Sequence, residues 1–341
     1  MTRRAHIPHY TSGRLALCAT MVVVVSILFP AASSSAARSP RASHKNASAL
    51  KGAAALGVYT GPANSAGVVT FQSQIGHKVS YAMDFIDGES WSTISHPSDL
   101  SIWSSSGYKM IWGVPMLPNS GASLAVGAQG AYNGYYASLA SALIAAGQGS
   151  AILRIGWEFN GNWFPWAAAN HASQFVQYFR NIVTTMRAVP GEKFTFEWNP
   201  SRGDVNAGNL AQYWPGDKYV DYVGLSVFDV EWQTYPGQPA EFRQMLTEPD
   251  GLDWMAGFAA KHHKPMVIPE LGLGWGKCSA SGGSIAGPGQ VCGGDDGAFV
   301  KEISRWIDTH NVFETTFWDY GTSTVTNKAN TLTALRTAWG A

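Results

Sequence analysis

The chain has 341 residues, of which 45% are hydrophobic, 12% aromatic and 13% charged, and its 23 basic and 23 acidic side chains give a formal net charge of zero. The hydrophobic share is ample for a buried core, and the length fits one large domain or two small ones. No basic run occurs beyond the first few residues. This composition argues against nucleic acid as a partner, because phosphate binding needs clustered Lys and Arg.

The N-terminus has the three parts of an export signal. Arg3, Arg4 and Arg14 precede an apolar run from Leu15 to Pro30, and the small residues "AASSSAARSP" follow it. A charged region, a short apolar region and a zone of small residues are typical of a secretory signal peptide. The alternative is a single membrane anchor, although the run is short for a span of ~30 Å.

This pattern divides the chain into three parts. We expect residues 1–37 to be a signal peptide that is cleaved between Ala32 and Ala37, and residues 38–52 to be a polar linker. Residues 53–341 then form the folded domain. The mature protein is expected to be a secreted, extracellular monomer with no membrane attachment.

Two cysteines remain after signal cleavage, since Cys18 lies within the apolar run of the signal. Cys278 and Cys292 are separated by thirteen residues rich in Gly and Ser. In an oxidising compartment this spacing predicts a disulfide, and the alternative is two unpaired thiols. No His lies near them and no metal-ligand spacing occurs elsewhere, so we expect no metal and no cofactor.

Short apolar runs alternate with longer helical patterns through the rest of the chain. The predicted strands are residues 56–60, 79–86, 109–115, 151–157, 193–199, 220–227, 265–269 and 313–318. The predicted helices are residues 131–146, 172–188, 252–262, 298–309 and 330–339, and the clearest of them repeats apolar side chains at Phe175, Phe179, Ile182, Val183 and Met186.

Apolar strands that alternate with helices predict a parallel sheet covered by helices, which is an α/β fold. Eight such repeats favour a closed (β/α)8 TIM barrel over an open doubly wound sheet. The sequence has neither a dinucleotide-binding glycine fingerprint nor a phosphate-binding loop, which are the usual reasons to prefer the open form. We therefore predict a single (β/α)8 domain.

Two glutamates stand at the ends of predicted strands in this barrel. Glu158 follows the fourth strand and Glu270 follows the seventh, and each precedes a turn that contains Gly. Reacting groups of such barrels lie at the C-terminal ends of the strands, so both carboxyl groups can face each other across the mouth. A pair of carboxylates is the requirement for glycoside hydrolysis. The alternative for either glutamate is a structural pair with an arginine, and Arg154 is the obvious partner for Glu158.

The stretch "LRIGWEFNGNWFPW" resembles the family 26 glycoside hydrolases, which are secreted β-mannanases and their relatives in a clan of retaining (β/α)8 barrels. The family has an Arg-containing strand, then a motif like His-Glu-Met-Asn-Gly, then tryptophan and further aromatics. The stretch "PELG" around Glu270 is similar to the family's Glu-Phe-Gly, and "VDYVGLSVFD" resembles its sixth strand. The residues that match the first motif are Arg154, Glu158, Asn160, Gly161, Trp163 and Trp166.

The resemblance implies roles for several of these residues. It makes Glu158 the general acid/base, Glu270 the nucleophile and Trp318 a platform on which a sugar stacks. The chain departs from the family at Trp157, where the family has His immediately before the acid/base. This departure leaves the mechanism of the clan intact but puts the substrate in doubt.

Other residues are expected to support the pair. The aromatic surroundings of Glu158, including Trp157, Phe159 and Trp163, should raise its pKa by disfavouring the charged form. Arg154 would lower that pKa, so we expect it to serve Glu270 or the network that faces the sugar. Glu197 is expected to be a core partner for an arginine. Nine residues are candidates for substrate contacts, each with a structural role as the alternative: Arg154, Trp157, Asn160, Trp163, Trp166, Asp84, Asp229, Trp275 and Trp318.

The leading hypothesis is a retaining endo-glycosidase that acts on a β-linked polysaccharide or oligosaccharide, with β-mannan as the first guess. An endo-β-glucanase or a β-xylanase of the same clan is the alternative within this class. A barrel that binds carbohydrate without catalysis is the alternative outside it. An esterase is disfavoured because the chain has no G-x-S-x-G elbow, and a zinc protease because it has no H-E-x-x-H motif.

Overall fold

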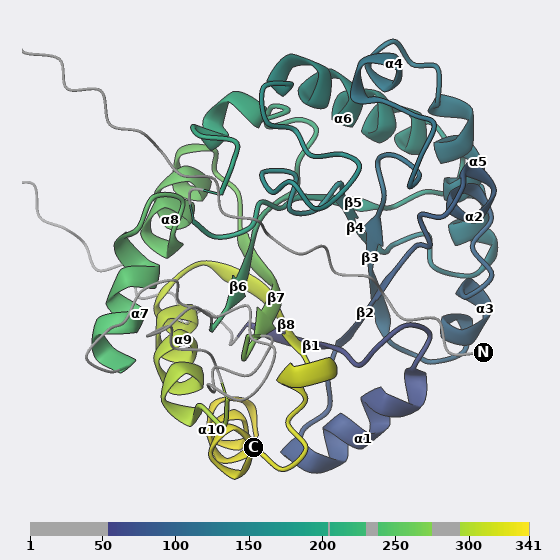
Figure 1. Cartoon of the computed structure of the whole chain (residues 1–341). Coiled ribbons are helices and arrows are strands. Elements are labelled where there is room, and N and C mark those ends of the chain that lie inside the picture. The colour runs from purple at the N-terminus through teal and green to yellow at the C-terminus, as the bar shows by residue number, and fades with distance from the viewer. Residues whose placement is uncertain (1–53, 204, 230–237, 275–293, 341) are drawn as a thin grey trace, which may run out of the picture. The chain divides into compact units, whose positions relative to one another are not determined.

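The computed structural model describes residues 54–203, 205–229, 238–274 and 294–340 (Figure 1). Within these residues, eight parallel strands form a closed barrel in the order β1 to β8. The predicted (β/α)8 fold and all eight predicted strands are confirmed. The strands are β1 (Ala55–Tyr59), β2 (Tyr81–Phe85), β3 (Lys109–Val114), β4 (Ile152–Ile155), β5 (Thr195–Trp198), β6 (Tyr222–Phe228), β7 (Met266–Gly272) and β8 (Val312–Trp318).

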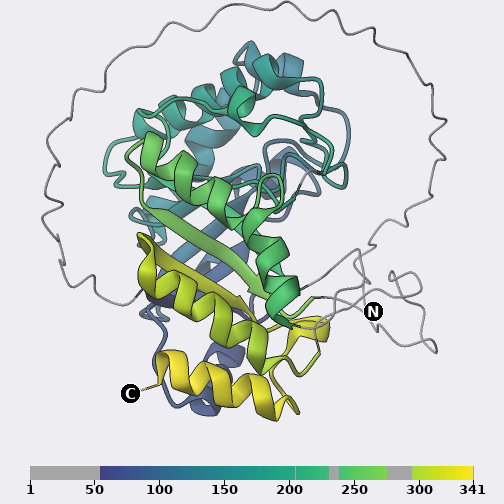
Figure 2. The same ribbon diagram turned by 90° about the vertical axis from the view of Figure 1, so that its left-hand side faces the viewer.

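Helices surround the strands, as Figure 1 shows. In the view turned by 90°, the green and yellow helices α7 to α10 lie in front of the strands (Figure 2). The five predicted helices are confirmed within one or two residues at each end: α5 (Asn133–Ala145), α6 (Ala172–Arg187), α8 (Leu252–Lys261), α9 (Gly297–Thr309) and α10 (Ala329–Trp339).

The described residues contain further helices that the sequence analysis missed. They are α1 (Ser65–Ile75), α2 (Trp91–Ser95), α3 (Leu100–Ser104), α4 (Leu124–Ala128) and α7 (Gln238–Thr247), with short 3-10 helices at Leu210–Tyr213 and Gly321–Ser323. Helix α1 buries only Val68, Phe71 and Ile75, and α2 to α4 have five residues each. So few buried positions give a weak periodic signal in the sequence.

The strands separate two apolar clusters. Outward-facing side chains such as Trp112 and Phe196 pack against the helices in the main core. Inward-facing side chains form a smaller cluster inside the barrel, with Tyr81, Met83 and Ile111 among its members. This alternation is the expected consequence of the two-residue period of a strand. The barrel interior is therefore a packed layer beneath the strand ends, and it forms the floor of the candidate site.

Several sequence-based predictions fall outside the described residues. They concern the signal peptide at residues 1–37, the linker at residues 38–52, the disulfide between Cys278 and Cys292, and Trp275 as a substrate contact. Among the described residues, no helix is both long enough and apolar enough to span a membrane.

Candidate active site

Glu158 lies in a tight turn directly after β4. Gly156 and Glu158 both have positive φ angles, of 57° and 52°. A Cβ atom on Gly156 would lie 2.4 Å from the Met116 sulfur, so a side chain here would displace Met116 and adopt a positive φ that favours Gly. Glu158 adopts the left-handed conformation without being Gly, which is uncommon and often marks a functional turn. Its backbone N–H donates to the carbonyl of Asn199 at the end of β5 (2.7 Å), which holds the turn.

Glu270 lies on β7, next to an interruption in the pairing of that strand. The register of β7 against β8 shifts between Ile268 and Leu271, and Pro269, which has no N–H to donate, lies within the shift. A bulge of this kind changes the direction of the side chain that follows it. The Glu270 side chain is buried, with 6% of its surface exposed, and it accepts a hydrogen bond from Arg154 Nη2 at 2.7 Å.

Arg154 is fully buried on β4 and connects several elements of the barrel. Its Nη2 also donates to Asn199 Oδ1, and its Nη1 lies 3.0 Å from the sulfur of Met83 on β2. Its Nε lies 3.4 Å from Glu197 Oε1 on β5. Arg154 was expected to serve Glu270 or the network that faces the sugar, and the structure shows its contact with Glu270. The expected pairing of Glu197 with an arginine is present, and Arg154 is the partner. Two buried carboxylates thus share one guanidinium.

The two site glutamates have different surroundings. Burial raises the pKa of Glu158 to about 8, and the nearby charge of Glu270 adds to this rise. Hydrogen bonds from Trp163 and Ser226 and the charge of Arg154 act in the opposite direction. Burial also raises the pKa of Glu270, while the hydrogen-bonded Arg154 stabilises its charged form. When the two glutamates together bind a single proton, these surroundings favour the state in which Glu158 is protonated and Glu270 is ionised.

Trp163 acts differently from the sequence-based expectation. Its indole Nε1 donates a hydrogen bond of 2.9 Å to Glu158 Oε2. A donor to a carboxylate stabilises the charged form, so this contact lowers the pKa of Glu158 instead of raising it. Trp163 is therefore an orienting group for the acid, while burial supplies the rise in its pKa.

Aromatic rings surround the barrel mouth above Arg154. Phe85, at the end of β2, lies 4.9 Å from Trp157 and 5.9 Å from Trp318 between ring centroids. Tyr59, at the end of β1, lies 4.3 Å from Trp318. The guanidinium carbon of Arg154 is 5.7 Å from the centre of the Phe85 ring. Tyr59 and Phe85 were not predicted as site residues, although both are the last residues of their strands.

Other predicted contact residues make hydrogen bonds within the protein. Asp84 accepts from Trp103 Nε1 and from the N–H groups of residues 63 and 85, at 2.8 to 2.9 Å. The Asn160 amide exchanges two hydrogen bonds of 2.8 Å with the backbone of Ser201. Trp166 donates to the carbonyl of residue 157 and is 3% exposed. Asp229, at the end of β6, is fully buried.

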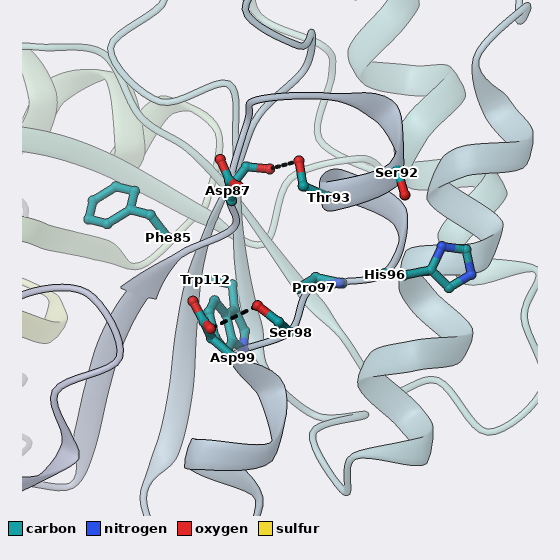
Figure 3. A pocket seen from close by; sticks show the side chains of 9 residues that line it. All are labelled: Phe85, Asp87, Ser92, Thr93, His96, Pro97, Ser98, Asp99 and Trp112. Atoms are coloured by element: carbon teal, nitrogen blue, oxygen red, sulfur yellow. Dashed lines mark hydrogen bonds between the residues drawn. The ribbon is translucent and has the colours of Figure 1, made fainter. Parts of the chain in front are cut away.

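A small cavity of about 120 Å³ with a mixed polar and apolar lining lies beside β2, between the segments that lead into α2 and α3 (Figure 3). Asp87, Ser92, Thr93, His96 and Asp99 line it, and neither Glu158 nor Glu270 is among its lining residues. Among the described residues, no group of three or more His, Cys, Asp or Glu side chains is arranged to hold a metal ion.

Comparison with known proteins supports the likeness that the β4 motif indicated. Residues 138–280 match the sequence profile of glycosyl hydrolase family 26, and this stretch contains Arg154, Glu158 and Glu270. The chain is 30% identical over 148 residues to a beta-1,3-xylanase from Alcaligenes sp, and 28% identical over 123 residues to endoglucanase H from Acetivibrio thermocellus. These matches cover 42% and 33% of this chain, but only 27% and 13% of the two relatives.

Solved structures support the fold. A GH26-CBM35 beta-(1,4)-mannanase from Podospora anserina has a TM-score of 0.53 and 14% sequence identity, and the match covers 85% of this chain and 61% of that chain. Identity at this level bears on the fold alone. The chain therefore resembles family 26 in the sequence around its two glutamates and has the barrel fold of a family 26 mannanase.

Proposed function

We propose that this chain is a retaining endo-glycosidase that hydrolyses a β-linked polysaccharide, with Glu158 as the acid/base and Glu270 as the nucleophile. The observation that carries the proposal is the contrast between the two carboxyl groups. Glu158 hydrogen-bonds to a neutral indole and has a pKa of about 8, whereas Glu270 hydrogen-bonds to a guanidinium. A proton donor and an ionised nucleophile at the ends of β4 and β7 are what double displacement requires.

In the first step Glu270 attacks the anomeric carbon and forms a glycosyl ester as the bond to the leaving oxygen breaks. Glu158 gives its proton to that oxygen. In the second step Glu158, now ionised, takes a proton from water, which attacks the anomeric carbon and releases Glu270. Arg154 holds the nucleophile in place through the 2.7 Å contact. Trp163 holds the acid at the position from which it protonates the leaving group.

β-Mannan is the first candidate substrate, and a β-glucan or β-xylan is the alternative. The match to the sequence profile of glycosyl hydrolase family 26 supports the first choice, while the sequence likenesses to a xylanase and an endoglucanase support the others. Trp157 bears on this question, because its indole packs against Phe85 and Trp166 where the family has an imidazole. Trp157 is 7% exposed, so the replacement removes a hydrogen-bonding imidazole from the mouth and offers a sugar little free ring face.

The test uses β-mannan, β-glucan and β-xylan, with the products sized by chromatography. The parent chain should release oligosaccharides of several lengths from one of them, as endo cleavage requires. Glu158→Gln and Glu270→Gln should each lower kcat about 10²- to 10⁴-fold or more, because each removes a group that acts in the transition state. Glu302→Gln, on the outer helix α9, is the matched control and should keep the parent rate.

A near-parental rate in either site variant would refute the two-carboxylate assignment. Binding of a polysaccharide without any hydrolysis would favour the non-catalytic carbohydrate-binding barrel instead.

We also propose that the protein is exported and carries a disulfide, on the composition of residues 1–37 and the spacing of Cys278 and Cys292. Expression of the full chain with recovery from the medium, followed by N-terminal sequencing, would test the first point. The mass of the peptide that joins the two cysteines, before and after reduction, would test the second. An intact N-terminus retained in the membrane fraction would instead favour an anchor.

A further inference from the structure

Three aromatic rings form a stack where α2 packs against the first turn of α5. The indole of Trp91, the first residue of α2, lies parallel to the ring of Tyr135, with 4.5 Å between centroids and 6° between planes. Tyr132, just before α5, lies 4.5 Å from the same indole. Tyr135 is 37% exposed, so the stack presents an ordered aromatic surface to solvent. Trp91, Tyr132 and Tyr135 are called the α2/α5 stack below.

The α2/α5 stack lies at the catalytic end of the barrel. Helix α2 follows β2, and α4 and α5 follow β3, so the segments that lead to the stack leave the C-terminal ends of these strands. Phe85 ends β2 and contacts Trp157, the neighbour of Glu158. Trp91 comes six residues after Phe85, which limits the distance between their Cα atoms to ~20 Å. The stack is thus separated from the reacting groups but belongs to the same face.

A chain of contacts joins the stack to the turn that carries Glu158. Trp91 meets Tyr136 edge to face, with 6.2 Å between centroids. The Tyr136 hydroxyl donates to the carbonyl of Met116 at 2.7 Å, and the Met116 side chain packs against Gly156. The stack therefore has a fixed position relative to the site.

On the basis of the proposed function, we propose that the α2/α5 stack is a distal subsite that binds a sugar ring of the same β-linked polysaccharide, away from the bond that is cleaved. A neutral polysaccharide offers no charge to recognise, so its binding depends on hydrogen bonds and on contact between apolar ring faces and aromatic side chains. The stack supplies such a face. Ser92, the neighbour of Trp91 on α2, lines the separate cavity between α2 and α3 (Figure 3).

A second stacked aromatic pair provides a matched control. Phe313 is 39% exposed and stacks on Tyr222 with 4.8 Å between centroids and 27° between planes. These residues are at or next to the first positions of β8 and β6, at the end of the barrel opposite to Glu158 and Glu270. The pair is similar to the α2/α5 stack in exposure and centroid distance but does not share the catalytic face.

The experiment measures binding in the full chain made inactive by Glu158→Gln, with soluble β-mannan, β-glucan and β-xylan as probes in affinity electrophoresis. Tyr135→Ala should weaken binding of the recognised polymer about two- to tenfold, which corresponds to the loss of one aromatic stacking contact. Tyr135→Phe keeps the ring and should restore binding, and Phe313→Ala should bind like the parent. In the active chain, Tyr135→Ala should lower the ratio of kcat/KM for the polymer to kcat/KM for a short oligosaccharide by a similar factor. Thermal unfolding of each variant checks that the fold is intact.

Unchanged binding in a folded Tyr135→Ala variant overturns the subsite, as does an equal loss in Phe313→Ala or in Tyr135→Phe. These results leave the proposed hydrolase standing if the active parent chain cleaves the polymer. Conversely, a parent chain that binds a polymer without cleaving it refutes the hydrolase, and a loss of that binding in Tyr135→Ala still supports the subsite.

Discussion

Replacement of Trp163 by Phe should move the alkaline limb of the pH profile upward. The indole donates a 2.9 Å hydrogen bond to Glu158 Oε2, and this bond favours the ionised carboxylate. Phe keeps most of the ring and removes the donor. In the proposed mechanism Glu158 must be protonated to act on the leaving oxygen, so activity should fall as the pH rises through its pKa of about 8.

The size of the pKa shift follows from how much more the indole hydrogen bond stabilises the ionised carboxylate than the protonated carboxyl group. A hydrogen bond to a charged acceptor contributes about 1.5–3 kcal/mol and one between neutral groups about 0.5–1.5 kcal/mol. The difference is about 1.0–1.5 kcal/mol, which corresponds to about one pKa unit. The limb should therefore move from about 8 in the parent to about 9 in Trp163→Phe.

The assay is kcat/KM against pH, which reports ionisations of the free enzyme. Trp166→Phe is a matched control, since it removes an indole N–H that donates to a backbone carbonyl and not to a carboxyl group. Its alkaline limb should stay in place. An unmoved or lowered limb in Trp163→Phe would refute the assignment of Trp163 as a donor that holds the acid.

Two further substitutions test the support of the site. Arg154→Met leaves the buried Glu270 and Glu197 without their shared cation and should lower the free energy of unfolding by about 3–5 kcal/mol near pH 8, measured by urea titration. Both carboxyl groups have raised pKa values, about 7 for Glu197, so they take up protons as the pH falls. The loss of unfolding free energy should therefore shrink toward pH 5. A loss that grows on acidification would contradict this account. Gly156→Ala places a Cβ against Met116 at a positive φ and should cost about 2 kcal/mol in unfolding together with a lower kcat, whereas a variant with parental stability would show that the turn tolerates a side chain.

The order of strands and helices and the positions of the two glutamates were readable from the sequence. Continuous apolar runs between helical patterns are a local signal, because a parallel strand is buried on both faces. Glu158 and Glu270 were recognised because each stands directly after such a run, and barrel closure brings the ends of all strands to one face. These inferences needed only the chain order.

The partners of each side chain were decided by the tertiary structure. Arg154 has Glu158 four residues away in the sequence, yet it hydrogen-bonds to Glu270 on β7 and to Asn199 after β5, because barrel closure brings these segments within reach of the inward-facing guanidinium. Asp84 and Asn160 bind Trp103 and Ser201, which are distant in the sequence. No local pattern encodes such contacts.

The aromatic surfaces were decided in the same way. Tyr59 and Phe85 looked like ordinary strand residues, and they became part of the mouth because neighbouring strands place Trp157 and Trp318 against them. The sequence thus determined the fold and the strand-end positions of the two glutamates through the pattern of its own elements. The surroundings of that pair, which set its proton affinity, depend on residues that only the closed barrel brings together.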